Sequence, residues 1–369
     1  MKIQAVPFTA LLVAGLLAGR SSPALAGSSG TWAQTGSMSM ARAGHTATLL
    51  NDGRVLVAGG VGSSGGNLAS AEIYDPTTGT WTRTADMSQG RAYHTATLLS
   101  GGEVLVAGGR GSGGSSAELY DPVAGRWSAT GSMAAARSHH AAALLAGGEV
   151  LVAGGVGSTG ADLAGAEIYD PRTSAWAATG SMNVARAFAM ATSLANGEVL
   201  IAGGNETTSA AGHSAEIFAN GQWRLTGSMA WERGSDTSAL LANGGVLVFG
   251  GGSLAGGEIY ELAGGAWATT YGFGAAPPVA GQTETTLGTG EVMVVGGVDR
   301  YQGTDRIAHL YNPSTNRWLT SGAMNQARTQ HAATVLWNGQ VLVTGGELQV
   351  DSSGRITSTV FASAEIYSP

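Results

Sequence analysis

The sequence has no cysteine, one lysine and few charged residues, and each shortage excludes a class of protein. Without cysteine there is no disulfide, thiolate metal site or cysteine nucleophile. Charged residues make up 12% of the 369 residues and the net charge is −7, whereas a nucleic-acid-binding surface is basic. The single lysine is Lys2, so every later basic side chain is an arginine. We therefore expect no nucleic-acid partner.

Long apolar runs are also lacking. The run from Ala10 to Ala18 is too short to span a bilayer, and it follows the positive charge of Lys2. Ala24-Leu25-Ala26 is a small-x-small cleavage site, so residues 1–26 are predicted to be a signal peptide and the mature chain to start at Gly27. No cysteine follows the apolar run, which excludes a bacterial lipid anchor. We expect a secreted or periplasmic monomer without a membrane anchor.

Glycine is what the chain has in abundance. With Gly 60 the sequence is too glycine-rich for a helical protein, and at 43% hydrophobic residues it is too apolar for a disordered one. The stretch from Arg42 to Gly60 recurs seven times at intervals of 46 to 49 residues. Each copy ends in a glycine pair, and the pairs begin at Gly59, Gly108, Gly154, Gly203, Gly250, Gly296 and Gly345.

Each repeat reads as four short strands. In the first copy, alternating residues up to Leu50 and the run from Val55 flank Asn51-Asp52-Gly53, which favours a two-residue hairpin. A variable Gly/Ser-rich loop and a third strand, residues 71–74, follow the glycine pair. Asp75-Pro76 suits a type I turn before a fourth strand that opens with a tryptophan. These tryptophans are Trp81, Trp127, Trp176, Trp223, Trp267 and Trp318. Four antiparallel strands per repeat describe a propeller blade.

The order of these residues resembles the kelch family: an Arg-x-x-His segment, a glycine pair, then tyrosine and tryptophan at fixed intervals. The resemblance covers residues 31–369. It implies an all-β fold, a seven-bladed kelch-type β-propeller with four-stranded antiparallel blades that forms one domain over residues 27–369.

The two ends of the chain predict how the ring closes. The seventh repeat stops at residue 369, before its tryptophan strand, whereas Trp32 stands ten residues before Arg42 without a repeat of its own. Trp81 precedes Arg91 by the same spacing. Residues 31–37 are therefore expected to supply the missing fourth strand of the last blade, which also restrains both chain ends.

An arginine stands 17 residues before six of the glycine pairs, and a glutamate lies on the third strand of the same six repeats. The sixth repeat has Val279 and His309 instead, so both residue types are lost together. An anion-binding ring of arginines is the alternative, but buried arginine requires a carboxylate partner, so structural pairs are favoured. The predicted pairs are Arg42 with Glu72, Arg91 with Glu118, Arg137 with Glu167, Arg186 with Glu216, Arg233 with Glu258, and Arg328 with Glu365.

Histidine recurs 14 residues before the glycine pair in four repeats, as His45, His94, His140 and His331. Four imidazoles at equivalent positions raise the question of a metal site. Equivalent positions on different blades point to different places, however, and a metal needs ligands around one point. We expect these histidines to cap backbone groups between blades and expect no metal and no cofactor.

The loops before the first strand and after the second strand lie on one face in propellers of this type. They carry aromatic and charged residues that the repeat does not require, which is typical of recognition surfaces. With Glu284, a channel carboxylate candidate, the predicted ligand-binding residues are Tyr93, His139, Phe188, Trp231, Asp236, Tyr271, Glu284, Arg300 and Tyr301.

A binding module for carbohydrate or an extracellular protein partner is the favoured function. The alternative is a carbohydrate-active enzyme similar to galactose oxidase or to a sialic acid mutarotase. The galactose-oxidase resemblance implies a copper site with a Tyr–Cys cross-link and a ligand from a further C-terminal domain. The absence of cysteine, and repeats that extend to residue 369, disfavour that chemistry. General acid–base catalysis would need a free carboxylate in the channel, for which Glu284 and Asp236 are the candidates.

Overall fold

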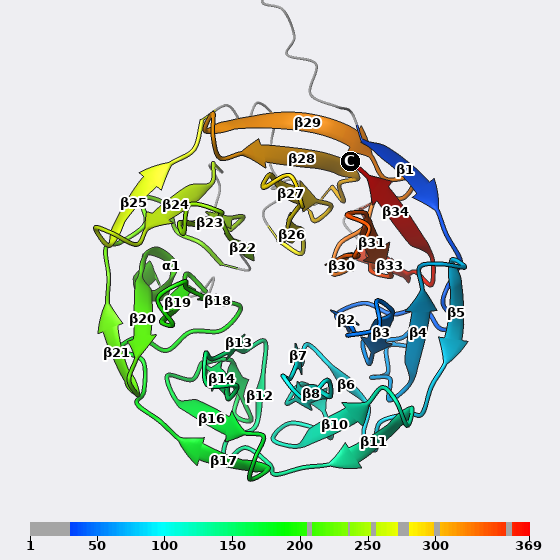
Figure 1. Ribbon diagram of the computed structural model, residues 1–369, viewed down its shortest axis with the longest axis horizontal. Helices are drawn as coiled ribbons and strands as arrows, with labels where there is room; N and C mark the ends of the chain where they lie inside the picture. The colour runs from blue at the N-terminus through cyan, green and yellow to red at the C-terminus, as the bar shows by residue number, and fades with distance from the viewer. Residues whose placement is uncertain are drawn as a thin grey trace, which may run out of the picture.

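The computed structural model describes residues 30–204, 209–234, 237–251, 256–271, 280–298, 303–351 and 356–369. These residues form seven four-stranded antiparallel sheets arranged as the blades of a ring around a central axis (Figure 1). Successive blades follow one another along the chain. The fold is the seven-bladed propeller that the repeats predict.

The strands are named blade by blade, from the axis outward. Blade 1 has β2 (Thr46–Leu49), β3 (Val55–Ala58), β4 (Ala71–Asp75) and β5 (Thr80–Arg83); blade 2 has β7 (Thr95–Leu98), β8 (Val104–Ala107), β10 (Ala117–Asp121) and β11 (Arg126–Ala129). Blade 3 has β13 (Ala141–Leu144), β14 (Val150–Ala153), β16 (Ala166–Asp170) and β17 (Ala175–Ala178); blade 4 has β18 (Met190–Ser193), β19 (Val199–Ala202), β20 (Ala215–Ala219) and β21 (Gln222–Leu225). Blade 5 has β22 (Thr237–Leu240), β23 (Val246–Phe249), β24 (Glu258–Glu261) and β25 (Ala266–Thr269); blade 6 has β26 (Thr283–Thr286), β27 (Val292–Val295), β28 (Ile307–Asn312) and β29 (Arg317–Ala323).

Blade 7 is built from both ends of the chain. Its strands are β30 (Ala332–Val335), β31 (Val341–Thr344), β34 (Ala364–Ser368) and, outermost, β1 (Thr31–Gln34). Trp32 pairs with Tyr367 across the junction, and their rings lie 5.1 Å apart. In Figure 1 the blue N-terminal strand lies beside the red C-terminal strand. The predicted ring closure is therefore present.

Smaller elements lie in the loops. The loops after the second strand pair with the segment before the first strand in β6 (Arg91–Ala92) with β9 (Arg110–Gly111), and in β12 (Arg137–Ser138) with β15 (Val156–Gly157). Blade 7 carries the hairpin β32 (Glu347–Asp351) and β33 (Ile356–Val360), and blade 4 carries the short helix α1 (Ser209–His213). Within the described residues, no helix has the length and apolarity that a membrane crossing requires.

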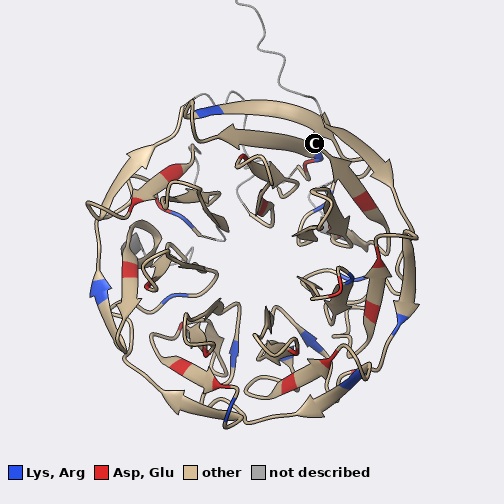
Figure 2. Cartoon of the chain, viewed as in Figure 1, with Lys and Arg blue, Asp and Glu red and all other residues tan. Residues whose placement is uncertain are grey.

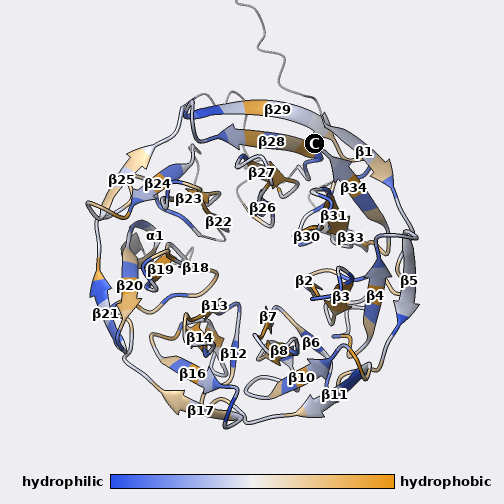
Figure 3. Cartoon of the chain, viewed as in Figure 1, coloured by the Kyte–Doolittle hydropathy of each residue, from blue (hydrophilic) through white to orange (hydrophobic). Residues whose placement is uncertain are grey.

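The hydrophobic core lies between the blades. Every residue of each second strand is buried, because its alternate side chains face the two neighbouring blades. Figure 3 colours each residue by its hydropathy. In β3, Leu56 packs in one cluster with Val104 of blade 2, whereas Val57 packs in another with Leu342 of blade 7. The fold is thus held by burial of apolar surface between successive blades all around the ring.

The glycine pair allows the blades to approach closely. A Cβ on Gly59 would lie 2.4 Å from the carbonyl oxygen of Arg91 in the next blade, closer than a carbon atom can approach. The amide of Gly60 donates to the same oxygen at 2.9 Å. The strand 1–2 turn differs slightly from the expectation: the amide of Leu50 donates to Arg54, so the turn holds three residues and Gly53 takes the left-handed conformation (φ 85°).

Candidate functional site

A cavity of about 820 Å³ lies on the propeller axis. Every blade contributes to its wall, mainly through the first strand and the residues before it. The lining residues that carry aromatic, charged or amide side chains are Tyr93, Arg110, His139, Phe188, Gln282, Glu284 and Gln330, together with His45, His94, His140 and His331. The cavity is therefore the place where variable side chains from different blades converge.

Six residues form a collar around this cavity, each at the second position after the repeat arginine or its counterpart. All six have a left-handed backbone with φ between 52° and 70°. We call Gly44, Tyr93, His139, Phe188, Gly281 and Gln330 the collar. Four of them are not glycine, although a side chain in this conformation costs about 1 kcal/mol or more. Such strain is typical of functional sites, because the surrounding structure must maintain it.

Backbone hydrogen bonds connect the collar from blade to blade. The amide of Gln330 donates to Gly281, that of Gly44 to Gln330 and that of Tyr93 to Gly44, each at 2.9 Å. The series continues, with the amide of His139 donating to Tyr93 at 3.0 Å and that of Phe188 to His139 at 2.9 Å. Each collar residue thus bonds to its neighbour through its main chain, so the left-handed conformation persists whatever the side chain.

The collar side chains of blades 2, 3 and 4 form a continuous aromatic surface, which we call the aromatic arc (Tyr93, His139 and Phe188). Tyr93 stacks on His139 with ring centroids 4.3 Å apart, and His139 meets Phe188 at 4.2 Å. The hydroxyl of Tyr93 donates to Oε1 of Gln330 at 2.5 Å. That reach requires glycine at position 44, where a Cβ would lie 2.5 Å from Cε1 of Tyr93.

The arc is neutral near pH 7 and has a cation beside it. Burial lowers the pKa of His139 to about 4, with the nearby Arg110 guanidinium adding to the shift. Burial also raises the pKa of Tyr93. The guanidinium carbon of Arg110 lies 5.7 Å from the centroid of the Tyr93 ring, within cation–π range. The site therefore combines apolar ring faces with one cationic and one amide group.

Glu284 adds a carboxylate to the cavity wall. It stands 12 residues before its glycine pair, where five blades have alanine and blade 5 has Ser238. Thr237 donates to Oε2 of Glu284 at 2.9 Å. A carboxylate here is a departure from the repeat that blade packing does not require.

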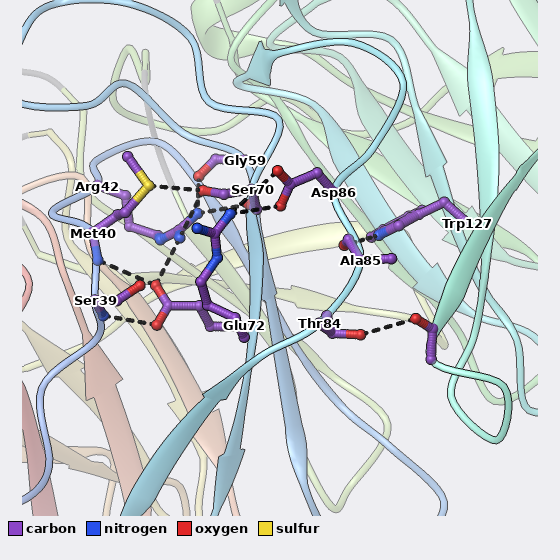
Figure 4. A network of polar contacts seen from close by, with 12 residues as sticks. Ser39, Met40, Arg42, Gly59, Ser70, Glu72, Thr84, Ala85, Asp86 and Trp127 are labelled. Atoms are coloured by element: carbon purple, nitrogen blue, oxygen red, sulfur yellow. Dashed lines mark hydrogen bonds and ion pairs between the residues drawn. The ribbon is translucent and has the colours of Figure 1, made fainter.

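The repeat arginines lie outside the cavity lining and have the predicted glutamates as partners. The six ion pairs span 2.7 to 3.0 Å, and all twelve residues are buried. In blade 1, Arg42 also donates to the carbonyls of Gly59 and Ser70, and Glu72 accepts from the amide of Ser39 (Figure 4). The glutamate of each ion pair lies on the third strand of its blade, and acidic residues recur there around the ring (Figure 2). Each pair connects the glycine pair, the third strand and the incoming loop, which is a structural role.

The four repeat histidines make contacts between blades, but the partner differs from the expectation. Nε2 of His94 lies 3.0 Å from the hydroxyl of Thr46 in blade 1, and Nε2 of His140 lies 2.9 Å from Thr95 in blade 2. The group across the blade boundary is thus a threonine hydroxyl rather than a backbone group. The threonine lies on a first strand for His94, His140 and His331, whereas the partner of His45 is Thr344 on the second strand of blade 7.

The structure brings together only some of the predicted ligand-binding residues. Tyr93, His139, Phe188 and Glu284 line the cavity. Asp236, Arg300 and Tyr301 lie outside the described residues.

Trp231 and Tyr271 are not among the cavity-lining residues. The Trp231 ring lies 5.8 Å from the guanidinium of Arg233 and covers the buried ion pair to which this arginine belongs. Tyr271 is 67% exposed and bridges to Arg317 of the outer strand β29.

Gln330 and Arg110 line the cavity and were not predicted. Gln330 stands at the same repeat position as Tyr93, so the register itself could have found it.

Comparisons with known proteins agree with this architecture. Residues 41–88 and 137–183 match the family profile of the Kelch motif. A solved structure described as a novel fungal alcohol oxidase with catalytic diversity among the AA5 family, in complex with copper, superposes with a TM-score of 0.75. It is 17% identical, and the match covers 92% of this chain and 76% of that chain. No curated protein sequence matches. At this identity the likeness shows the fold alone, because one fold hosts many activities.

The residues of this chain do not fit the copper site that the galactose-oxidase-like fold implies. The Tyr–Cys cross-link has no cysteine to form it. Among the described residues, no three His, Asp or Glu side chains are grouped closely enough to hold a metal ion.

Proposed function

We propose that this chain, a kelch-repeat β-propeller, is a binding module that holds a short saccharide in its central cavity. The aromatic arc is the observation that supports the proposal. Three side chains from three blades present rings in contact at the cavity, held in a left-handed backbone conformation that residues other than glycine seldom adopt. Nothing in blade packing requires these rings, since Gly44 and Gly281 occupy the equivalent positions in blades 1 and 6.

A saccharide suits the chemistry of the site. One face of a sugar ring carries C–H groups that pack on an aromatic plane, and its edge carries hydroxyls that bind amide, guanidinium or carboxylate groups. The Gln330 amide lies at one end of the arc and Arg110 beside it. A cavity of about 820 Å³ is within the usual range for small-ligand sites. A concave site on the axis favours a small ligand over the flat surface of a protein partner.

An acid–base enzyme acting on the bound saccharide is the second candidate. The observation in its favour is Glu284, a carboxylate at a cavity position where five blades have alanine. A general acid or base must lie within hydrogen-bond reach of the reacting group. If Glu284 is catalytic, Glu284→Gln will abolish a change in optical rotation or reducing ends of the bound saccharide yet retain binding.

Export is part of the proposal. Residues 1–26, which lie outside the described residues, have the composition of a signal peptide. N-terminal sequencing of protein from the culture medium or periplasm is expected to begin at Gly27. A chain that retains Met1 in the cytoplasm would contradict export.

A glycan array followed by calorimetric titration tests the binding proposal. Phe188→Ala removes one end of the arc, and a central aromatic anchor is worth about 2 kcal/mol or more, which is about 30-fold in Kd. Trp337→Ala is the control, since Trp337 is 68% exposed on a strand 1–2 hairpin and does not line the cavity. Equal losses from the two variants, or binding only to protein ligands, would refute a saccharide site at the collar.

A further inference from the structure

Among the described residues that line the cavity, Arg110 is the one lysine or arginine. We propose that the site selects acidic saccharides, whose carboxylate binds Arg110 while the sugar ring packs on the aromatic arc. The inference rests on the proposed saccharide-binding function and specifies the class of ligand.

The main chain of Arg110 is fixed, and among the described residues its guanidinium has no carboxylate partner. Ala92 pairs with Arg110 across β6 and β9, and Nδ2 of Asn67 donates to the Arg110 carbonyl at 3.2 Å. Within the described part of the chain the guanidinium has no ion pair, in contrast to the six buried repeat arginines, and its contact is the Tyr93 ring at 5.7 Å. The side chain is exposed to solvent. An immobilised backbone and an unpaired cation at a cavity are what an anion-binding group requires.

The repeat does not require arginine at this position. Arg110 is the second residue after the start of its glycine pair, where blades 1, 3 and 6 have Val61, Val156 and Val298. These valines make the corresponding loop pairings without a charge. The charge at position 110 therefore has no part in forming the loop.

Blade 7 carries the opposite charge at the same position. Glu347 begins β32, and its charge acts on Tyr93 together with that of Arg110. Glu347 pairs with Thr329, the residue before Gln330 of the collar, so the arc has a cation on its blade 2 side and a carboxylate on its blade 7 side. An acidic saccharide is directed by this pair of charges: its carboxylate is attracted to Arg110 and repelled from Glu347. The same arrangement orients the sugar on the rings.

Titration with two probes that differ at C6 tests the proposal: tri-galacturonate, which is acidic, and the matching neutral galactotriose. The acidic probe is expected to bind about tenfold tighter or more, because a charge-assisted hydrogen bond is roughly twice as strong as a neutral one. The difference should shrink between 20 and 500 mM salt, since exposed charges are screened.

Arg110→Gln removes the charge and keeps a hydrogen-bonding group. It should reduce acidic-probe binding to the neutral level, with a smaller loss for the neutral probe, and Arg110→Lys should restore part of the difference. Arg126→Gln is the matched control, because Arg126 is exposed on the outer strand of the same blade and changes net charge equally.

Equal binding of the two probes, or equal effects of the two glutamine variants, would overturn the selectivity for acidic saccharides and leave saccharide binding in place. If neither probe nor any array saccharide binds, both proposals fail.

Discussion

Replacing Arg91 by valine tests the structural role of the Arg–Glu pairs. Arg91 is fully buried and Glu118 is 3% exposed, with Nη2 of Arg91 2.8 Å from Oε1 of Glu118. The double variant Arg91→Val/Glu118→His gives blade 2 the residue types that blade 6 has at positions 279 and 309. We expect the double variant to be more stable than the single Arg91→Val variant, although it carries one more substitution.

The contacts of Arg91 and Glu118 determine how much stability each substitution costs. Removing one partner of a buried ion pair costs about 3–5 kcal/mol, because the remaining charge is left uncompensated. Glu118 would retain only the Ser88 amide at 2.8 Å. Arg91 also donates to the Gly108 carbonyl at 2.8 Å, and losing that donor adds about 1–3 kcal/mol. In the double variant the Gly108 carbonyl still lacks its donor, but the uncompensated Glu118 carboxylate is gone. The coupling free energy between the two substitutions is therefore expected to be about 3–5 kcal/mol.

Urea unfolding of the wild type, both single variants and the double variant measures this coupling. Tryptophan fluorescence and far-UV circular dichroism must give coincident transitions, since the free energies assume two-state unfolding. The exposed pair Arg83 and Asp86, 3.0 Å apart and about half exposed, is the control, and its coupling should stay below about 1 kcal/mol. If the effects of Arg91→Val and Glu118→His add to within about 0.5 kcal/mol, the two residues act separately and the pairing argument fails.

Two further predictions concern ring closure and pH. A chain without residues 30–38 loses strand β1 and the contact between Trp32 and Tyr367, so its melting temperature should fall by several degrees, and unchanged melting would contradict closure by β1. Burial lowers the pKa of His45 and His94 well below the ordinary value of 6.5, and lowers the pKa of His140 and His331 to about 3. The unfolded chain takes up protons that these folded-state imidazoles do not, so their contribution is complete above pH 6.5 and is lost as the pH falls toward 3. Between pH 7 and pH 5 the free energy of unfolding should drop by about 2 kcal/mol for each histidine. His140→Gln should reduce that drop, and a pH-independent urea midpoint would refute the assignment.

The fold could be predicted because it depends on features that recur at fixed spacing. The glycine pair, the third-strand glutamate and the tryptophan each have one role that every blade repeats, so their register indicates a blade and their number indicates the ring. Ring closure followed from one spacing, that of Trp32 to Arg42. The threonine partners of His94 and His140 were missed because first-strand contacts across a blade boundary join residues nearly fifty positions apart.

The site could be predicted only in part, because membership of a loop does not fix distance from the axis. Tyr93 and Trp231 both lie in loops before a first strand, yet Tyr93 lines the cavity and Trp231 covers Arg233. The difference is four positions in the register: Tyr93 stands two residues after its repeat arginine, whereas Trp231 stands two residues before its own. The left-handed backbone that defines the collar leaves no sign in residue types such as tyrosine and phenylalanine, which rarely adopt it.

The collar makes the proposed binding surface interchangeable between blades. Because the six collar residues are held by main-chain hydrogen bonds of the same kind, a Cα–Cβ bond at any of these six positions has the same local orientation. Moving a tyrosine from position 93 to position 139 would therefore rotate its ring about the propeller axis by one blade without rebuilding a loop. Asparagine, aspartate and histidine tolerate the left-handed conformation best and are the natural choices for new polar contacts there. Exchanging side chains among the collar positions would thus change the proposed ligand selectivity of this propeller and leave its fold unchanged.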